Sequence, residues 1–347
     1  MPAQVHVSRR LTDVSIHYPW DFTSVGERFF PRRPTEHLTD QFAYANKANL
    51  LRLEELSPLG DDDVPPEIEL VWDADKKFSC RVYGVSSPGK WITEKNADPS
   101  LDYETERTIQ LTTSLRLRLE YLRYVQRLRS TTYMTSNSTL TGAQRFDNYA
   151  SGSSAPIETM QFIVNNIAYA NQGKRPNRIA ATTFAWQAIL NSEDFRDRVK
   201  FNDAPSLHVP SMNEDVSGYL GAIEKLIGVA PGTIIISDAT YNVAAASQTP
   251  VYTTFAGPDM VFGFVEDLGL RKYSLSAGFQ WSAYSSDPQA IISVPQYNQG
   301  TMPTDQLRAF TVIDPFIIEP TLGYLLKGVI STTQDSNGNS YGDLVAH

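Results

Sequence analysis

The sequence predicts a mixed fold, α/β or α+β, with one long amphipathic helix, several shorter helices and a set of short apolar strands. The 347 residues are 41% hydrophobic and 20% charged, which is the balance of a folded protein that buries a sizeable core. Apolar side chains repeat every three or four residues in some segments and every second residue in others. Because short apolar runs alternate with amphipathic segments along the second half, a mixed fold is favoured over a pure bundle or sandwich.

Composition excludes several functional classes. One cysteine, Cys80, allows neither an intramolecular disulfide framework nor a cysteine-based zinc site, and predicts a buried thiol. The formal net charge of −9 argues against a body that grips nucleic acid by neutralising phosphates. No run approaches the roughly 18 apolar residues of a membrane span, and the first ten residues lack the apolar core of a secretory signal. We therefore expect a cytosolic chain with no membrane partner.

The first forty residues are polar and carry prolines, and they predict an irregular arm. The segment 29–34 reads Phe-Phe-Pro-Arg-Arg-Pro, and its two prolines force extended or turn geometry. We expect this arm to bury little against the rest of its own chain.

Strand-like alternation between Gln41 and Tyr83 predicts a hairpin. The alternating apolar residues are Ile68, Leu70 and Trp72 before the polar stretch 73–76, and Phe78, Cys80 and Val82 after it. The nearby Asp61-Asp62-Asp63 and Pro65-Pro66 are too polar and too stiff for a core. This hairpin is therefore predicted to project from the body and to need a partner.

A long helix is predicted near residues 99–129. Asp98 suits its N-cap and Pro99 its first turn, and the full length would span about 45 Å. Its apolar stripe consists of Leu111, Leu115, Leu119 and Leu122. Its other faces carry Arg116, Arg118, Arg123, Arg127 and Arg129. With Glu104, Glu106 and Glu120 on the same element, these arginines are expected to form helical ion pairs or contacts between chains, with contact to nucleic acid as the alternative.

A second helix is predicted to begin at Pro156 and to end near Gly173. One face of it carries Ile157, Met160, Val164 and Ile167. Apolar or amphipathic segments then predict further strands and helices at 179–183, 184–190, 219–227, 233–237 and 260–265. Residues 307–330 predict the last strands, and the Ser/Thr/Asn/Gly-rich tail 331–339 is predicted to be frayed.

No pattern in the chain predicts catalysis. The histidines are His6, His17, His37, His208 and His347. His208 has no spaced acid or base partner, and the phosphate-loop, nucleophile-elbow and His-Glu-x-x-His patterns do not occur. The triplet at 61–63 lacks the alternating ligands and closing Glu of a calcium loop. We predict no catalytic residue, cofactor or metal; an α/β enzyme or ligand-binding protein with an inserted hairpin stays open and would require a pocket of convergent polar groups.

The order of these parts resembles the major capsid proteins of tailed bacteriophages, with the Hong Kong ninety-seven type shell fold. The motifs that carry the resemblance are Phe30-Pro31, Pro66-Glu67-Ile68, Phe78 with Cys80, Asn96-Ala97-Asp98 with Leu101-Asp102, and Pro176-Asn177 followed by Trp186 and Leu190. Each motif is short, and their shared order is what is similar to the family. The resemblance extends from about residue 29 to residue 330.

This resemblance implies four parts: an N-terminal arm (1–44), an extended loop (45–85), a peripheral domain (86–177 and 301–347) with the spine helix, and an axial α/β domain (178–300). It implies hexamers and pentamers that build an icosahedral head around double-stranded DNA without sequence-specific binding and mature from a procapsid. Implied partners are a scaffolding protein, a portal and a cement or decoration protein. The implied location is the virion, assembled in the host bacterial cytoplasm. An encapsulin-type compartment shell is the alternative.

The resemblance also implies contacts between subunits. The residues predicted to make them are Phe30, Arg32, Arg33, Ile68, Trp72, Lys76, Lys77, Arg81, Arg116 and Arg123. The Lys–Asn–Glu arrangement of one cross-linking branch cannot be mapped, although Lys76, Lys77 and Lys90 are available. No helical leader of domain size precedes the arm, so we expect an internal scaffolding segment to be absent.

Overall fold

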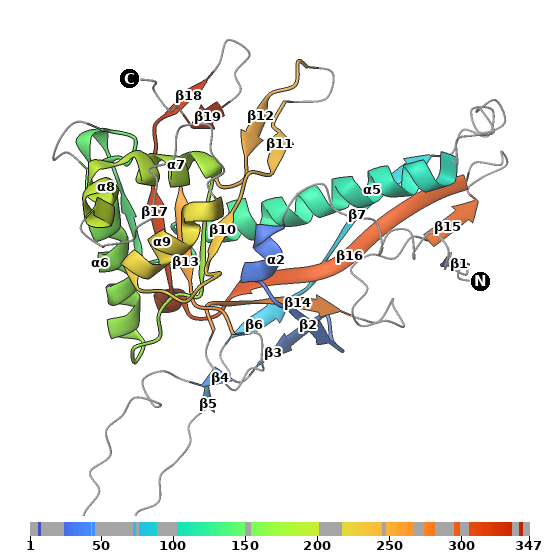
Figure 1. Ribbon diagram of the computed structural model, residues 1–347. Coiled ribbons are helices and arrows are strands. Elements are labelled where there is room, and N and C mark those ends of the chain that lie inside the picture. The colour runs from blue at the N-terminus through green and yellow to red at the C-terminus, as the bar shows by residue number, and fades with distance from the viewer. Residues whose placement is uncertain are drawn as a thin grey trace, which may run out of the picture.

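The computed structural model describes residues 6–7, 24–42, 44–45, 72–73, 76–88, 103–149, 154–200, 217–244, 248–266, 274–281, 295–298, 305–334 and 340–342. Two sheets dominate it, and helices accompany both (Figure 1). One sheet is elongated and lies along a single long helix. The other carries four shorter helices. None of the described helices combines the length and apolar character that crossing a membrane requires.

The long helix runs as α5 (Tyr103–Glu120) and continues as a π-helical segment, η1 (Tyr121–Leu128). Its predicted leucine stripe is confirmed, because Leu111, Leu115, Leu119 and Leu122 are all buried. The α-helical part alone spans about 27 Å at 1.5 Å per residue, and η1 carries the helix to Leu128, one residue before its predicted end. The predicted start at residues 98–102 lies outside the described residues.

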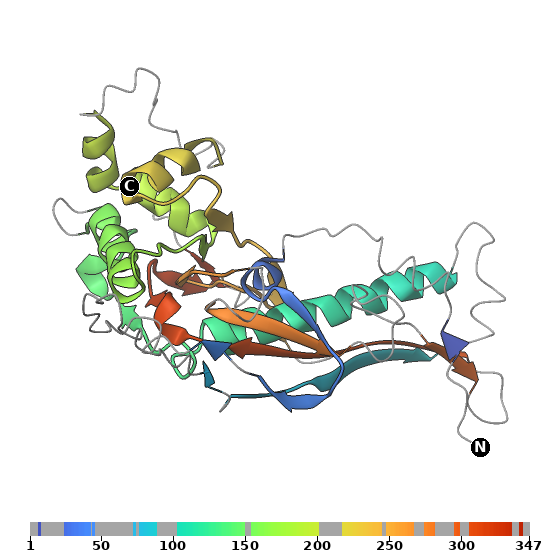
Figure 2. The same cartoon turned by 90° about the horizontal axis from the view of Figure 1, so that it is seen from below.

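The leucine stripe packs on two long antiparallel strands, β7 (Arg81–Pro88) and β16 (Asp305–Ile317). Figure 2 shows α5 running alongside them. The shared apolar contacts include Leu115 with Leu307 and Leu119 with Ile313. This helix-on-strand layer forms the long part of the molecule.

The strand β16 organises the six-stranded sheet. Its order is β1-β15-β16-β14-β2, with β7 also paired to β16. The remaining members are β1 (His6–Val7), β15 (Pro295–Asn298), β14 (Ser276–Trp281) and β2 (Arg32–Thr35). In β14, a Cβ on Gly278 would lie 3.0 Å from the carbonyl oxygen of Phe30, so the glycine permits the close approach of the β2 chain.

The second sheet has five strands in the order β10-β9-β13-β17-β8. Its strands are β10 (Ile234–Ile236), β9 (Arg178–Ala181), β13 (Met260–Gly263), β17 (Gly323–Lys327) and β8 (Asn137–Thr139). Every residue of β13 is buried, which is typical of a strand covered on both faces. The strand and helix types predicted for this half of the chain are confirmed.

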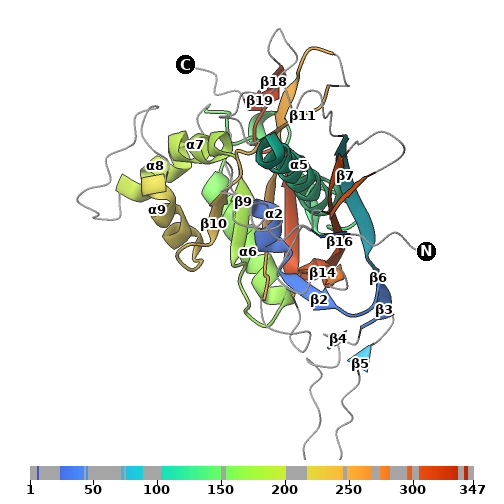
Figure 3. The same cartoon turned by 90° about the vertical axis from the view of Figure 1, so that its right-hand side faces the viewer.

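Four helices accompany this sheet, as Figure 3 shows from the end of the molecule. They are α6 (Pro156–Ala170), α7 (Thr183–Asn191), α8 (Glu193–Lys200) and α9 (Ser217–Ile227). The apolar face predicted for α6 is buried in the largest core cluster, together with Trp186 of α7. Proline stands at the start of α6, where its missing N–H costs nothing, and the Thr182 side chain caps α7.

A small sheet holds part of the tail that was predicted to be frayed. It has the order β11-β12-β19-β18. The strands are β11 (Thr240–Asn242), β12 (Tyr252–Thr254), β19 (Ser340–Gly342) and β18 (Thr332–Gln334). The prediction is wrong for 332–334, because β18 pairs with β19, which in turn pairs with β12.

Four strand pairings among the described residues cross the predicted boundary at residue 300. Strands β14 and β15 both pair with β16, β13 pairs with β17, and β12 pairs with β19. The boundary therefore separates strands that share a sheet. The sequence did not show these pairings, because hydrogen bonds between distant segments leave no local pattern. The division into peripheral and axial domains stays a prediction.

Two valines that are paired in the register of β7 and β16 provide a matched test of the apolar cluster that contains Val312. Val312 is 4% exposed, whereas its partner Val82 is 65% exposed. Val312→Ala should lower the free energy of unfolding by about 2 kcal/mol, since it removes two buried methyl groups and leaves a cavity. Val82→Ala should change it by less than about 0.5 kcal/mol. Urea unfolding followed by circular dichroism measures both, and equal effects would contradict this packing.

Candidate assembly site

The segment 24–42 does not behave as an irregular arm. Residues Val25–Phe29 form helix α2, and β2 follows it into the long sheet. Val25, Phe29 and Phe30 are fully buried in a cluster with Tyr124 and Leu128 of η1. The expectation that the arm buries little is therefore wrong for this part. Phe30, predicted to contact another subunit, is inside its own.

The prolines of this segment do not prevent regular structure. Pro31 lies between α2 and β2, and Pro34 lies within β2, which pairs in parallel with β14. Since β2 is the last strand in the sheet order, the missing N–H of Pro34 costs little there. The prolines correctly predicted extended backbone at these positions. The burial of Phe29 and Phe30, however, determines where the segment packs.

One carboxylate fastens the start of α2 to the long helix. Glu120 is 1% exposed, and its Oε1 accepts hydrogen bonds from the backbone N–H groups of Val25 at 3.0 Å and Gly26 at 2.7 Å. Its Oε2 accepts from the Ser24 hydroxyl at 2.7 Å. Burial raises the pKa of Glu120, whereas the hydrogen bonds from Gly26 and Ser24 and the charge of Arg123 oppose that rise. The carboxylate satisfies backbone donors that α2 leaves unpaired.

Close packing at this junction requires a glycine. A Cβ on Gly26 would lie 2.8 Å from Cβ of Arg123 and 2.9 Å from Oε2 of Glu120. Both distances are shorter than van der Waals contact. The backbone of α2 therefore lies directly against the long helix.

Two arginines of the long helix are buried at the same junction. Arg116 is 4% exposed and Arg123 is 5% exposed, and the neighbouring Arg32 forms an ion pair with Glu27 of α2. Burial lowers the pKa of Arg116 to about 10, and the negative charge of Glu27 counteracts part of that effect. Burial also lowers the pKa of Arg123. These two arginines, predicted to form helical ion pairs or contacts between chains, are therefore buried within their own chain where α2 packs against the helix.

Two strand pairs form the base of the predicted loop. Strand β3 (Thr39–Gln41) pairs with β6 (Lys77–Ser79), and β4 (Tyr44–Ala45) pairs with β5 (Trp72–Asp73). The predicted hairpin turned at residues 73–76, but 72–73 pairs with 44–45 and 77–79 pairs with 39–41. The reason is that Phe78 stacks on Phe279 of β14 and lies near Phe42, and both partners are distant in sequence. Residues 46–71, including Ile68 and Asp61-Asp62-Asp63, lie outside the described residues.

An aromatic cluster fixes this base to the long sheet. The Phe78 ring stacks on Phe279 with centroids 4.4 Å apart, and Phe42 lies 5.1 Å from Phe279. The Cys80 thiol is 7% exposed and donates to the carbonyl oxygen of Phe279 at 3.6 Å. Burial raises the pKa of Cys80 to about 11, so the thiol is protonated at neutral pH. The prediction of a buried thiol is confirmed.

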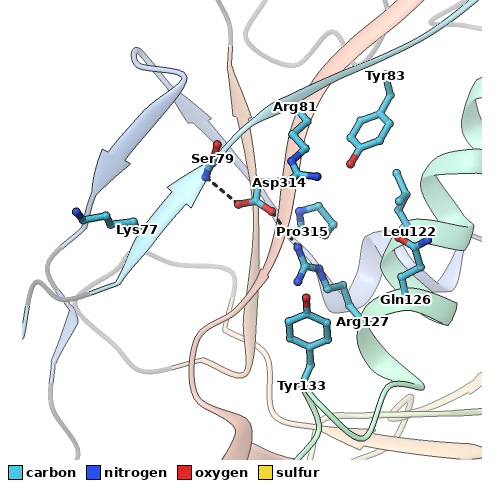
Figure 4. A pocket seen from close by; sticks show the side chains of 10 residues that line it. All are labelled: Lys77, Ser79, Arg81, Tyr83, Leu122, Gln126, Arg127, Tyr133, Asp314 and Pro315. Carbon is cyan, nitrogen blue, oxygen red and sulfur yellow. Dashed lines mark hydrogen bonds and ion pairs between the residues drawn. The ribbon is translucent and has the colours of Figure 1, made fainter.

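A polar cavity of about 290 Å³, which we name the Asp314 pocket, lies between the loop base and η1. Its lining consists of Lys77, Ser79, Arg81, Tyr83, Leu122, Gln126, Arg127, Tyr133, Asp314 and Pro315 (Figure 4). Asp314 accepts from the backbone N–H of Ser79 at 2.9 Å and pairs with Arg127 at 3.4 Å. The Arg127 guanidinium lies 4.3 Å from the centre of the Tyr133 ring. The pocket therefore has polar walls and a rim close to the loop.

The residues predicted to make subunit contacts fall into separate places. Lys77 and Arg81 line the Asp314 pocket, and Arg32, Arg116 and Arg123 meet at α2. Lys76 donates to the carbonyl oxygen of Ile318, Arg33 is half-buried in β2, and Trp72 belongs to β5. Whether any of these residues contacts another subunit stays a prediction.

Sequence reasoning missed Glu120 and Asp314 as organising carboxylates. For Glu120 the signal is weak, because only Leu117, three residues before it, and Tyr124, four residues after it, place apolar groups on its face of the helix. Asp314 stands within the apolar run 307–330, where a charged residue needs a partner. Their partners are 94 and 235 positions away in sequence, so neither pair leaves a local pattern.

No metal-binding group emerges from the described part of the chain, where no three His, Cys, Asp or Glu side chains gather. His37 is exposed, and His208 lies outside the described residues. The absence of catalysis remains a prediction.

The Glu120 clamp can be tested by substitution on one helix. Glu120→Ala should lower the free energy of unfolding by about 3–5 kcal/mol, because it removes the acceptor of two buried backbone donors and the negative charge that lies near the buried Arg123. Glu120→Gln should cost less, since its amide oxygen still accepts from Val25 and Gly26. The control Glu106→Ala removes an exposed carboxylate from the same helix and should change stability by less than about 0.5 kcal/mol. Thermal and urea unfolding measure the series, and an Ala variant as stable as the control would refute the clamp.

Comparison with known proteins supports the fold. No family model and no curated protein matches the chain. A crystal structure of a phage-related protein from Bordetella bronchiseptica RB50 matches with a TM-score of 0.65 and 16% identity over 94% of this chain and 98% of that one. The capsid of cyanophage P-SCSP1u matches at 0.52 with 9% identity over 89% of each chain, and the capsid of the native GTA particle at 0.51 with 10% identity over 89% and 91%. The chain therefore has the α+β fold of phage capsid proteins, as its sequence predicted.

Proposed function

We propose that this chain is the shell-forming subunit of an icosahedral particle, and specifically the major capsid protein of a tailed bacteriophage. The observation that carries the proposal is the whole-length likeness to the phage-related protein, which covers nearly all of both chains. A fold shared along its entire length includes the long sheet, the spine helix and the helix-covered sheet, not one common motif.

The loop base supports assembly as the function. Two short strand pairs, β3–β6 and β4–β5, carry the chain out of the body, and β4–β5 lies beyond β3–β6 (Figure 1). Two-stranded ribbons have little stability by themselves, so residues 46–71 gain most by contacting other subunits. In this proposal, ordering of the loop and closure of the shell are coupled.

Charge also fits a container. With a net charge of −9, the subunit does not adsorb DNA strongly, so a genome packed inside stays free of its wall. The proposed assembly uses hexamers and pentamers, whose closed rings are built from repeated head-to-tail contacts. A scaffolding protein, a portal and a cement or decoration protein are the further partners we propose, in the virion after assembly in the host cytoplasm.

Deletion of the loop tests the proposal. Replacing residues 46–71 by a short Gly-Ser linker should leave a folded monomer, because β3, β6 and the Phe42–Phe78–Phe279 cluster keep their contacts. The same variant should form no closed shells. Sedimentation velocity and electron microscopy measure assembly, and circular dichroism reports the fold.

The unmodified chain, with and without a co-expressed scaffolding protein, is the control. Loop-deleted subunits that still close shells would contradict the role of the loop. Double-stranded DNA inside particles from infected cells separates a viral head from an encapsulin-type compartment.

A further inference from the structure

The Asp314 pocket contains more positive than negative charge. Its cations are Lys77, Arg81 and Arg127, and Asp314 is its one carboxylate. Asp314 is already satisfied by Arg127 and by the N–H of Ser79. Within the described part of the chain, Lys77 and Arg81 form neither an ion pair nor a side-chain hydrogen bond, and both are exposed. Among the described residues, Arg81 in the pocket and Lys77 at its rim are therefore cations without an ion-pair partner.

Further donors lie around this positive charge. Figure 4 shows the Arg81 side chain directed toward Asp314 and Pro315, and the Tyr83 hydroxyl directed into the same space. The Lys77 ammonium points outward at the side of the loop base. Guanidinium and hydroxyl donors around a small cavity are the groups that recognise carboxylates. At about 290 Å³ the cavity is at the lower limit for a drug-sized ligand and suits a few acidic side chains.

The chain itself has a segment of complementary charge. Residues 46–71 contain seven Asp and Glu residues against one Lys and one Arg, a net charge of −5 in a chain whose total is −9. The acidic positions are Glu54, Glu55, Asp61, Asp62, Asp63, Glu67 and Glu69. More than half of the excess negative charge of the chain is therefore in the segment that leaves the body through β4 and β5.

The position of the loop base favours a second copy as the source of these acids. The pocket lies on the side of β6 and β7 that faces η1, whereas β4 and β5 lie beyond β3 and β6, on the side away from α5 (Figures 1 and 3). The chain thus leaves the body in a direction away from its own pocket. We propose that the Asp314 pocket binds the acidic segment of the loop, centred on Asp61 and Asp62, of a second copy. This inference rests on the proposed shell function.

Reciprocal charge reversal tests the contact. One variant carries Lys77→Glu and Arg81→Glu in the pocket, and the other carries Asp61→Lys and Asp62→Lys in the loop. Each should reduce the yield of closed shells at least about tenfold, because like charges then face each other. Combining the four changes in one chain should restore the yield. Raising the salt concentration should reduce the assembly of the unmodified chain, since screening weakens this attraction.

Mixing the two reversed variants separates the two sources of the acidic segment. In contacts between copies, the reversed pocket of one variant matches the reversed loop of the other, so the mixture should form mixed oligomers in sedimentation velocity that neither variant forms alone. If the loop instead contacts its own pocket, every chain keeps its mismatch and the mixture fails, which would overturn the inference.

The matched control carries Arg28→Glu and Lys225→Glu, two exposed cations away from the pocket with the same total charge change. It should assemble as the unmodified chain does. Pocket-reversed subunits that assemble as well as this control, or that no loop reversal rescues, would overturn the inference and leave the shell function intact. An unmodified chain that forms no shells would overturn the proposed function itself. Circular dichroism melting confirms that each variant is folded.

Discussion

The packing of the leucine stripe of α5 on β7 and β16 is the interaction on which the rest of the structure depends. The four leucines are buried against a strand, β16, that also pairs with β14 and β15, so one helix face orders most of the long sheet. Through β14, the same sheet reaches β2 and the N-terminal segment. Through η1, the helix also contributes Tyr124 and Leu128 to the cluster beneath the five-stranded sheet. Loss of this packing would separate the two sheets and release the loop base.

Polar contacts then determine how α2 and the loop base attach to the layer formed by the long helix, β7 and β16. Glu120 holds α2 by two backbone donors, and Asp314 holds β6 through Ser79 while it pairs with Arg127. Glu120 belongs to the long helix and Asp314 to β16. These two elements therefore supply the acceptors, and α2 and β6 supply the donors. Hydrogen bonds to charged groups are stronger than neutral ones, and they also fix register. The N-terminal segment and the loop base are thus held in defined positions, with the loop itself directed toward other subunits in the proposed assembly.

Sequence patterns predicted the elements whose signals are local. The apolar stripes of α5 and α6, the proline at the start of α6 and the run of β13 all follow from spacing within one segment. The patterns failed where packing depends on distant partners. Residues 29–34 suggested a break, but β14 offers them an edge nearly 250 positions away, and Phe78 pairs with the leg at 39–41 and not with the strand just before it. Arg116 and Arg123 appeared to be surface residues because nothing in the helix itself shows that α2 covers them.

A subunit whose core is shared between a long sheet and a helix-covered sheet, and whose loop leaves through two thin strand pairs, is suited to a closed shell. Its own fold is stabilised by burial within the chain, while in the proposed contact the pocket at the loop base receives the acidic segment of another copy. Cryo-electron microscopy of the purified full-length chain, together with its scaffolding protein, tests this account most directly. The account predicts closed icosahedral particles with α5 and β16 in the shell wall and the loop of each subunit lying on another. A population that stays monomeric at 38.7 kDa under all assembly conditions would contradict it.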